Sequence, residues 1–157
     1  MVWMVTLLSI VVILGFASYQ VFQFLESPGR NMSRLIIAII LMDIPVLCWL
    51  FSVSEYVLES DSLFIKRHIM PVRLKYDEIK SVSRLNSDYV KCSIRIFGNG
   101  GLFGFYGLFR NKNIGNYHAY FSNFSDLVLI ETEKKKLAIS PENSDFFIEY
   151  LKSRMNI

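Results

Sequence analysis

The sequence predicts two membrane-spanning helices followed by a mostly β domain that ends in one helix. Residues 2–25 contain no charged side chain, and residues 35–53 contain only Asp43. Residues 54–157 carry 15 of the 17 lysines and arginines and 12 of the 14 acidic residues, in short runs where apolar and polar residues alternate. This distribution excludes a disordered chain, a wholly soluble monomer and a disulfide scaffold. We therefore expect a transmembrane helical hairpin at 1–53 and a β domain at 54–157.

The first expected helix, at about 2–25, is long enough to cross a bilayer. Its 24 residues extend about 36 Å, against a hydrocarbon core of about 30 Å, so it spans with some tilt. A cleaved signal peptide is the alternative. Such a peptide has a basic N-terminal region, which is missing here, and a shorter apolar core.

The second expected helix, at about 35–53, contains twelve Leu, Ile, Val and Phe residues that favour insertion. Asp43 opposes insertion by roughly 2.5–3.5 kcal/mol, and Pro45 weakens the helix, but the sum stays favourable. The nine-residue link at 26–34 contains Pro28-Gly29, which predicts a tight turn between antiparallel helices. Asp43 is either an intramembrane ion or proton site, or a hydrogen-bonded residue that faces Thr6, Ser9 or Ser18.

The distribution of basic residues indicates which side the β domain occupies. Arg30 and Arg34 lie in the link, whereas Lys66, Arg67 and Arg73 lie shortly after the second helix. Three basic residues against two favour a cytoplasmic β domain under the positive-inside rule. Cys48 and Cys92 cannot bridge bilayer depth and a polar domain, so we expect two free thiols, which fits a reducing compartment.

The β domain is predicted from runs of period-2 alternation that are separated by turn residues. We expect strands at 54–59, 63–69, 72–76, 91–96, 103–109, 116–124, 127–132 and 135–140, six of them paired as hairpins around 60–62, 110–115 and 133–134. Ser140 as N-cap and Pro141 in the first turn predict an amphipathic C-terminal helix at about 141–155. About seven strands and one helix favour a strongly bent sandwich or a partly open barrel that the helix plugs with Phe147 and Leu151.

Two sequence segments resemble a known family. RIFGNGGLFGFYGLFRN at 95–111 and ISPEN at 139–143 are similar to the bacterial PH-like (pleckstrin-homology-like) domain family, over about residues 54–154. The resemblance implies an all-β PH-like barrel or orthogonal sandwich with a C-terminal α-helix, often placed after one or two membrane helices. It also implies a bacterial inner membrane as the location. The first hairpin turn, at 59–62, is acidic and would repel the polyphosphate head group that many PH domains bind.

Two groups of side chains are candidates for interaction. Alternation places Phe103, Phe105 and Phe109 on one face and Tyr106 on the other; these aromatic residues either pack in the core, enter the membrane interface or grip a peptide. The second group is a basic turn formed by Lys134, Lys135 and Lys136. This turn either contacts anionic lipid or is a solvated hairpin tip.

Nothing in the sequence predicts catalysis. His68 and His118 have no Cys or acidic neighbour at metal-ligand spacing, and the glycines at 98–107 do not match a nucleotide-binding loop. A net charge of +3, dispersed along the chain, does not favour nucleic acid. We expect no cofactor, no metal and no enzymatic activity, but a membrane-anchored module that binds a protein partner, a second copy of itself or anionic lipid. The alternative is a small accessory subunit of a membrane transport or enzyme complex, with Asp43 as its functional residue.

Overall fold

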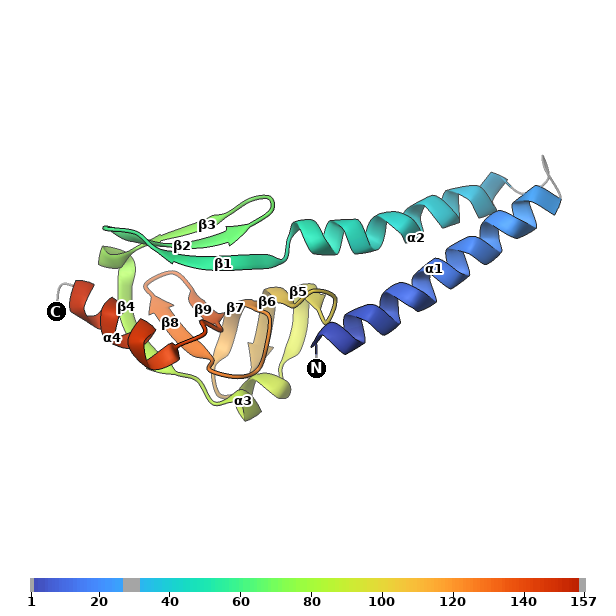
Figure 1. Ribbon diagram of the computed structural model, residues 1–157. Coiled ribbons are helices and arrows are strands. Elements are labelled where there is room, and N and C mark those ends of the chain that lie inside the picture. Colours follow the sequence, from blue (N-terminus) through green and yellow to red (C-terminus); the bar gives the residue numbers. More distant parts are fainter. Residues whose placement is uncertain (1, 27–31, 156–157) are drawn as a thin grey trace.

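Two long helices extend from one end of a β domain (Figure 1). The computed structural model describes residues 2–26 and 32–155. Helix α1 spans Val2–Glu26 and helix α2 spans Met32–Leu50, and they pack along one another, with Ala17 and Ala38 buried. The predicted Pro28-Gly29 turn lies outside the described residues. The second helix was expected to reach residue 53, but it ends at Leu50 because Ser52 bonds back to the Trp49 carbonyl and turns the chain into the first strand.

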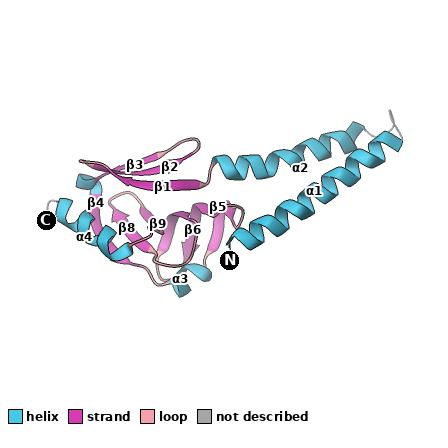
Figure 2. Ribbon diagram, viewed as in Figure 1, coloured by secondary structure: helices cyan, strands magenta, loops and turns pink. Residues whose placement is uncertain are grey.

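The β domain is a sandwich of two sheets (Figure 2). The first sheet has the order β1-β2-β3 and the second has the order β4-β8-β9-β7-β6-β5. The pairs are antiparallel except β7 and β9, which are parallel. The strands are β1 (Val53–Leu58), β2 (Ser62–Arg67), β3 (Val72–Lys75), β4 (Ile79–Arg84), β5 (Ile94–Gly100), β6 (Phe105–Asn111), β7 (Gly115–Phe121), β8 (Val128–Thr132) and β9 (Lys136–Ile139), with a 3₁₀ turn η1 (Tyr76–Glu78) and helices α3 (Ser87–Lys91) and α4 (Ser144–Arg154).

The core lies between the two sheets and under α4. Fully buried side chains of the first sheet, including Leu63 and Ile65, pack in one cluster with Ile130 and Leu137 of the second sheet. Leu151 of α4 belongs to the same cluster, as the sequence predicted for the closing helix. The predicted sandwich is confirmed, and the sheets do not close into a barrel.

Two elements depart from the expected order. The described residues form nine strands, against eight strand ranges and an estimate of about seven from the sequence, and β4 is the strand that was not expected. Its buried residues are Ile79 and Val82, three apart, because a bulge between Ile79 and Ser81 interrupts the period-2 pattern. The strand expected at 91–96 begins only at Ile94, since Cys92 ends the short helix α3.

The C-terminal helix begins three residues later than the sequence predicts. Asn143, not Ser140, caps it, because the Asn143 side chain accepts a hydrogen bond from the Phe146 backbone amide at 3.1 Å. The Ser140 hydroxyl is buried and accepts from the Ser122 amide at 3.3 Å. Ser140 therefore holds two loops together instead of starting the helix.

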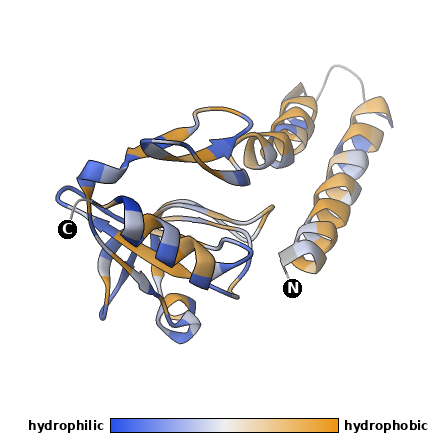
Figure 3. Ribbon diagram, turned by 60° about the vertical axis from the view of Figure 1, so that its left-hand side comes forward, coloured by the Kyte–Doolittle hydropathy of each residue, from blue (hydrophilic) through white to orange (hydrophobic). Residues whose placement is uncertain are grey.

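The two N-terminal helices are apolar over most of their surface (Figure 3). Trp3–Glu26 and Met32–Leu50 have mean hydropathies of 2.1 and 2.0 and are long enough to cross a membrane. Only 11% and 6% of these segments are buried in the chain, unlike the core helix of a soluble protein. For α1, a signal sequence would show the same length and composition.

Candidate functional site

The β domain contacts the helices through the loop between β5 and β6. The Thr6 hydroxyl of α1 donates to the Gly101 carbonyl at 3.2 Å and accepts from the Phe103 amide at 3.0 Å. Thr6 is 1% exposed, and the Trp3 and Phe103 rings meet edge to face at 6.4 Å. The Asn99 side chain donates hydrogen bonds to the Leu102 and Gly104 carbonyls. These bonds hold the loop to which Thr6 is hydrogen-bonded. We call this contact the helix–hairpin junction.

The end of helix α2 and the residue that follows it, Phe51, also contact the β domain at this junction. The rings of Phe51 and Tyr106 stack at 6.2 Å, and those of Trp49 and His68 lie 4.0 Å apart. The Leu50 carbonyl accepts from the Ile69 amide at 3.1 Å. Burial, followed by the neighbouring Cys48, raises the pKa of Tyr106, so its hydroxyl stays protonated at physiological pH. Both helices are thus tied to the domain by aromatic and hydrogen-bonded contacts.

A pair of glycines allows β5 and β6 to approach closely behind the junction. Gly98 and Gly107 face one another in the ladder and adopt φ of +115° and +116°. A Cβ on Gly98 would collide with the Tyr106 carbonyl oxygen, and one on Gly107 with that of Phe97. The glycine-rich sequence therefore serves backbone geometry at this position.

The four predicted aromatic residues divide into two groups. Phe105 and Phe109 pack in the core of the six-stranded sheet, where Phe105 stacks on Phe121 at 5.0 Å. Tyr106 lies on the opposite face, as alternation predicts. Phe103 precedes β6 with φ of +56°, outside the alternation, and belongs to the junction. Phe103 thus contacts α1, and Tyr106 contacts Phe51, the residue that follows α2, in this same chain.

Sequence reasoning did not predict the groove that lies between β1 and the start of α4. Its volume is about 560 Å³. Tyr56 is one of the lining residues. Its hydroxyl donates a hydrogen bond to the Tyr120 carbonyl at 2.6 Å and accepts one from the Ser140 amide at 3.1 Å. Phe146 lies in the lining with 59% of its surface exposed, whereas its neighbour Phe147 is buried. In the sequence, a signal for this groove is the position of Phe146, an aromatic residue one step off the apolar stripe of α4.

Comparison with known proteins agrees with this architecture. Residues 54–155 match the sequence profile of the family described as Bacterial PH domain. The chain belongs to the bacterial PH domain family. No curated protein and no solved structure matches the chain. The match covers β1 through α4 and leaves the helix pair outside the PH domain.

The first hairpin of this PH domain has its charges paired within the domain. Arg73 on β3 bonds to Glu59 at 3.3 Å and to Asp61 at 3.1 Å. A hydrogen bond from Ser62, followed by Arg73, lowers the pKa of the Asp61 carboxyl. Lys66 pairs with Glu55 at 2.5 Å. Arg73 and Lys66 are thus engaged by carboxylates, which disfavours a polyphosphate ligand at this turn.

The basic turn between β8 and β9 is also partly neutralised. Lys136 pairs with Glu131 at 2.7 Å, and Glu133 pairs with Lys80 at 3.1 Å. The Lys136 hydrogen bond lowers the pKa of Glu131. Lys134 and Lys135 lie beside these carboxylates in the turn, so the local charge is mixed rather than basic.

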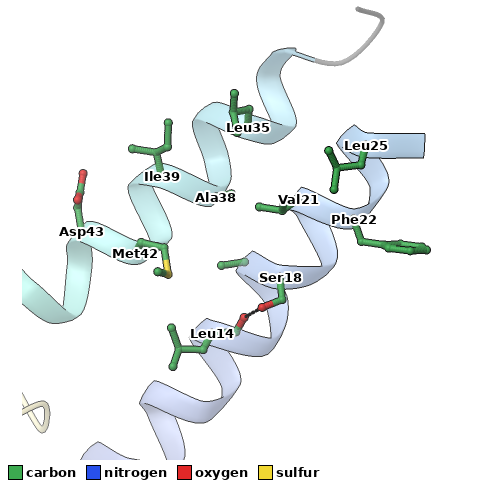
Figure 4. A pocket seen from close by; sticks show the side chains of 11 residues that line it. Leu14, Ser18, Val21, Phe22, Leu25, Leu35, Ala38, Ile39, Met42 and Asp43 are labelled. Carbon is green, nitrogen blue, oxygen red and sulfur yellow. Dashed lines mark hydrogen bonds between the residues drawn. The ribbon is translucent and has the colours of Figure 1, made fainter. Parts of the chain in front are cut away.

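Asp43 lies on the side of α2 that faces away from α1 (Figure 4). It borders a groove of about 540 Å³ between the helices, whose other lining residues are mainly apolar. Thr6 bonds to the β5–β6 loop, and the Ser18 hydroxyl donates to Leu14 of its own helix at 2.8 Å. The Asp43 side chain thus points away from Ser18 (Figure 4), and its expected contact with Thr6 or Ser9 stays a prediction.

Among residues 2–26 and 32–155, no group of three His, Cys, Asp or Glu side chains is placed to hold a metal ion. Cys48 and Cys92 are free thiols. His68 stacks on Trp49 and His118 stacks on Tyr120, so both histidines have packing roles.

Proposed function

We propose that this chain is a non-catalytic, membrane-anchored PH-domain module that binds an extended segment of a partner protein in the groove between β1 and α4. The observation that carries the proposal is the groove beside an open strand edge. Among the described strands, β1 pairs only with β2, so its other edge has free backbone groups. An added strand satisfies such an edge, and neighbouring pockets then select its side chains.

The lining of the groove suits a protein segment. Phe146 offers an exposed aromatic face, while Tyr56 is held in place by its two hydrogen bonds. Glu142, which is exposed, also lines the groove and favours a segment that carries a basic residue. A volume of about 560 Å³ is within the usual range for ligand sites.

The membrane anchor increases the effect of this binding. Strand β1 follows α2 after two residues, so one end of the groove lies close to the membrane helices. A partner in the same membrane would meet the groove at a raised local concentration, and weak contacts would then suffice. We place the anchor at 1–53 and the module at 54–157, on the cytoplasmic side of a bacterial inner membrane, because of the distribution of arginine and lysine.

Photo-crosslinking in native membranes tests the groove. A photoreactive residue at Ser54, which is exposed on β1, is expected to capture a partner protein in one discrete product. The same probe at Ser83, exposed on β4, is the matched control. Phe146→Asp should abolish the Ser54 product without unfolding the domain, since Phe146 is exposed. Equal crosslinked products from Ser54 and Ser83 would refute the groove as the binding site. A product between two copies of the chain would show self-association instead of binding to a different protein.

The side of the membrane has a separate test. Cys92 is exposed in the structure, whereas Cys48 lies near the end of α2. In a Cys48→Ser background, a membrane-impermeant thiol reagent should label Cys92 only after cells are permeabilised. Labelling of intact cells would place the domain outside.

Asp43 supports a second candidate, an accessory subunit of a larger membrane complex. A carboxylate at the centre of a span costs roughly 2.5–3.5 kcal/mol, and α1 does not cover it. A further membrane helix that pairs with Asp43 would remove this cost. Asp43→Asn is then expected to reduce the size of the complex in mild detergent, while Ser18→Ala, a change within α1, leaves it intact. An unchanged size in Asp43→Asn would eliminate this candidate.

A further inference from the structure

The edge strand β5 exposes an unusual amount of apolar surface. Ile94, Ile96 and Phe97 are 73%, 52% and 78% exposed, although they fall within four consecutive residues. β5 has β6 as its only neighbour among the described strands, so its outer edge is open. Clustered apolar side chains on an open edge are characteristic of a surface that another apolar phase covers.

The position of β5 identifies that phase. The loop after β5 bonds to Thr6, in the second turn of α1, and β5 lies at the end of the domain from which the helices extend (Figure 1). Trp3 and Trp49 mark the domain-side ends of the two helices, and tryptophan concentrates at the membrane–water boundary. With α1 and α2 in a bilayer, β5 therefore lies at the level of the lipid head groups.

The charges around β5 match this position. Arg95, Arg110 and Lys112 are exposed, and the ion pairs found among residues 2–26 and 32–155 involve none of the three. Arg110 lies directly opposite Ile94 in the ladder, so cations alternate with the exposed apolar groups. Anionic head groups attract such cations, at about 1 kcal/mol for each charge near the surface.

The backbone of β5 disfavours pairing with a second copy of the chain. The register shifts between Arg95 and Phe97, which leaves Ile96 out of the ladder, and Gly98 follows with φ of +115°. A bulge increases the twist and interrupts the row of hydrogen-bonding groups that an added strand needs. The edge thus presents side chains rather than a regular backbone template.

We propose that β5 is a lipid-contact edge, with Ile94, Ile96 and Phe97 immersed in the interfacial layer of the bilayer and Arg95 and Arg110 on the phosphates of anionic lipids. This inference rests on the proposed anchoring of α1 and α2 in lipid, and not on the groove. The PH domain then contacts the membrane through β5, and its first hairpin takes no part in this contact.

Site-directed fluorescence of the full-length chain tests the contact. In a Cys48→Ser, Cys92→Ser background, an environment-sensitive dye is placed on Phe97→Cys, in vesicles that contain anionic lipid. Ser83→Cys is the control, because Ser83 is exposed on β4, which stands at the opposite end of the same six-stranded sheet from β5. The dye at residue 97 is expected to emit at shorter wavelength and to be quenched by lipids that carry a spin label near the head group. The dye at residue 83 should behave as in water.

Four outcomes separate the explanations. Water-like emission from residue 97, in a chain that resists alkaline extraction from the membrane, overturns the lipid contact and leaves the anchor standing. Release of the chain by alkali removes the anchor itself, and the lipid contact with it. A blue shift that disappears in nanodiscs holding a single chain assigns the β5 edge to a second copy and also overturns the proposal; a shift that persists there supports it.

Discussion

Thr6 connects an apolar helix with a polar domain through a single hydroxyl. It is almost fully buried, although it lies within a segment whose surface is otherwise mainly exposed. Its hydroxyl donates to one end of the β5–β6 loop and accepts from the other. An isolated threonine in an apolar helix is commonly an internal helix contact, as Ser18 is here. The sequence could not distinguish the two, because the partner lies 95 residues away.

Thr6→Val keeps the shape of the side chain but removes both hydrogen bonds. The Phe103 amide and the Gly101 carbonyl are then left without this partner, at a cost of about 1–3 kcal/mol. We expect faster hydrogen exchange across residues 99–104 of the full-length chain in nanodiscs. Ser18→Ala is the control, since its hydroxyl bonds only within α1, and it should leave this exchange unchanged. Equal exchange in both variants would mean that Thr6 does not hold the junction.

The aromatic residues show how far alternation reaches at the residue scale. Phe105 and Phe109 were predicted on one face and Tyr106 on the other, and the strand confirms this. Phe103 was predicted with the first two, but its positive φ places it in the loop. Alternation holds only while the backbone is extended, and the sequence did not show where β6 begins.

At the scale of elements, the local sequence pattern predicted the hairpins. It missed a strand that contains a bulge and misplaced the start of a helix that has two candidate caps. The β6–β7 and β8–β9 hairpins were predicted because their strands alternate regularly. β4 escaped prediction because its bulge spaces Ile79 and Val82 by three. The start of α4 was misplaced because Ser140 and Asn143 are both good caps, and only tertiary contacts assign Ser140 to the Ser122 amide.

The β5–β6 hairpin depends on Gly98. Its φ of +115° is unfavourable for any side chain, at a cost of order 1–3 kcal/mol, and a Cβ would also collide with the backbone of Tyr106. We expect Gly98→Ala to lower the free energy of unfolding of the PH domain by at least that amount. Denaturant unfolding of the detergent-solubilised chain measures it.

Gly100→Ala is the matched control for this substitution. A Cβ there would meet the Phe105 ring at 3.5 Å, an ordinary van der Waals distance. It should change the free energy of unfolding by less than about 0.5 kcal/mol. Similar losses in the two variants would show that the hairpin responds to any added methyl group rather than to the backbone of Gly98.

The whole molecule was the scale that the sequence predicted best. The contrast between uncharged runs and a charged remainder extends over dozens of residues, so local irregularities do not obscure it. The groove between β1 and α4 is the opposite case. It forms where residues 53–58, 122–123 and 140–147 meet, and no local pattern contains all three segments.

Stability of the PH domain should decrease below neutral pH because of His118. Burial, followed by the neighbouring Lys135, lowers the pKa of this imidazole from its ordinary value of 6.5. Above pH 6.5 the imidazole is neutral in both states and has no effect. As the pH falls below 6.5, the unfolded chain takes up a proton that the folded domain resists, so the free energy of unfolding decreases until the lower folded pKa is reached.

A His118→Gln variant checks this assignment. We expect its free energy of unfolding to vary less than wild type between pH 7 and pH 5. Glu131 acts in a separate range, since Lys136 lowers its pKa from 4.5 and its contribution is lost only below that value. An identical pH profile for the variant would assign the loss of stability to other groups.

The distance along the chain between Thr6 and its partners has a consequence for biosynthesis. A ribosome delivers α1 first, but the residues that Thr6 binds follow 95 and 97 positions later. Helix α1 therefore has no docking partner for Thr6 until the β5–β6 hairpin has been translated and has formed. A nascent chain halted before residue 101 would contain α1 without the loop that Thr6 binds, and the docking of this helix on the PH domain is thus a late step of folding.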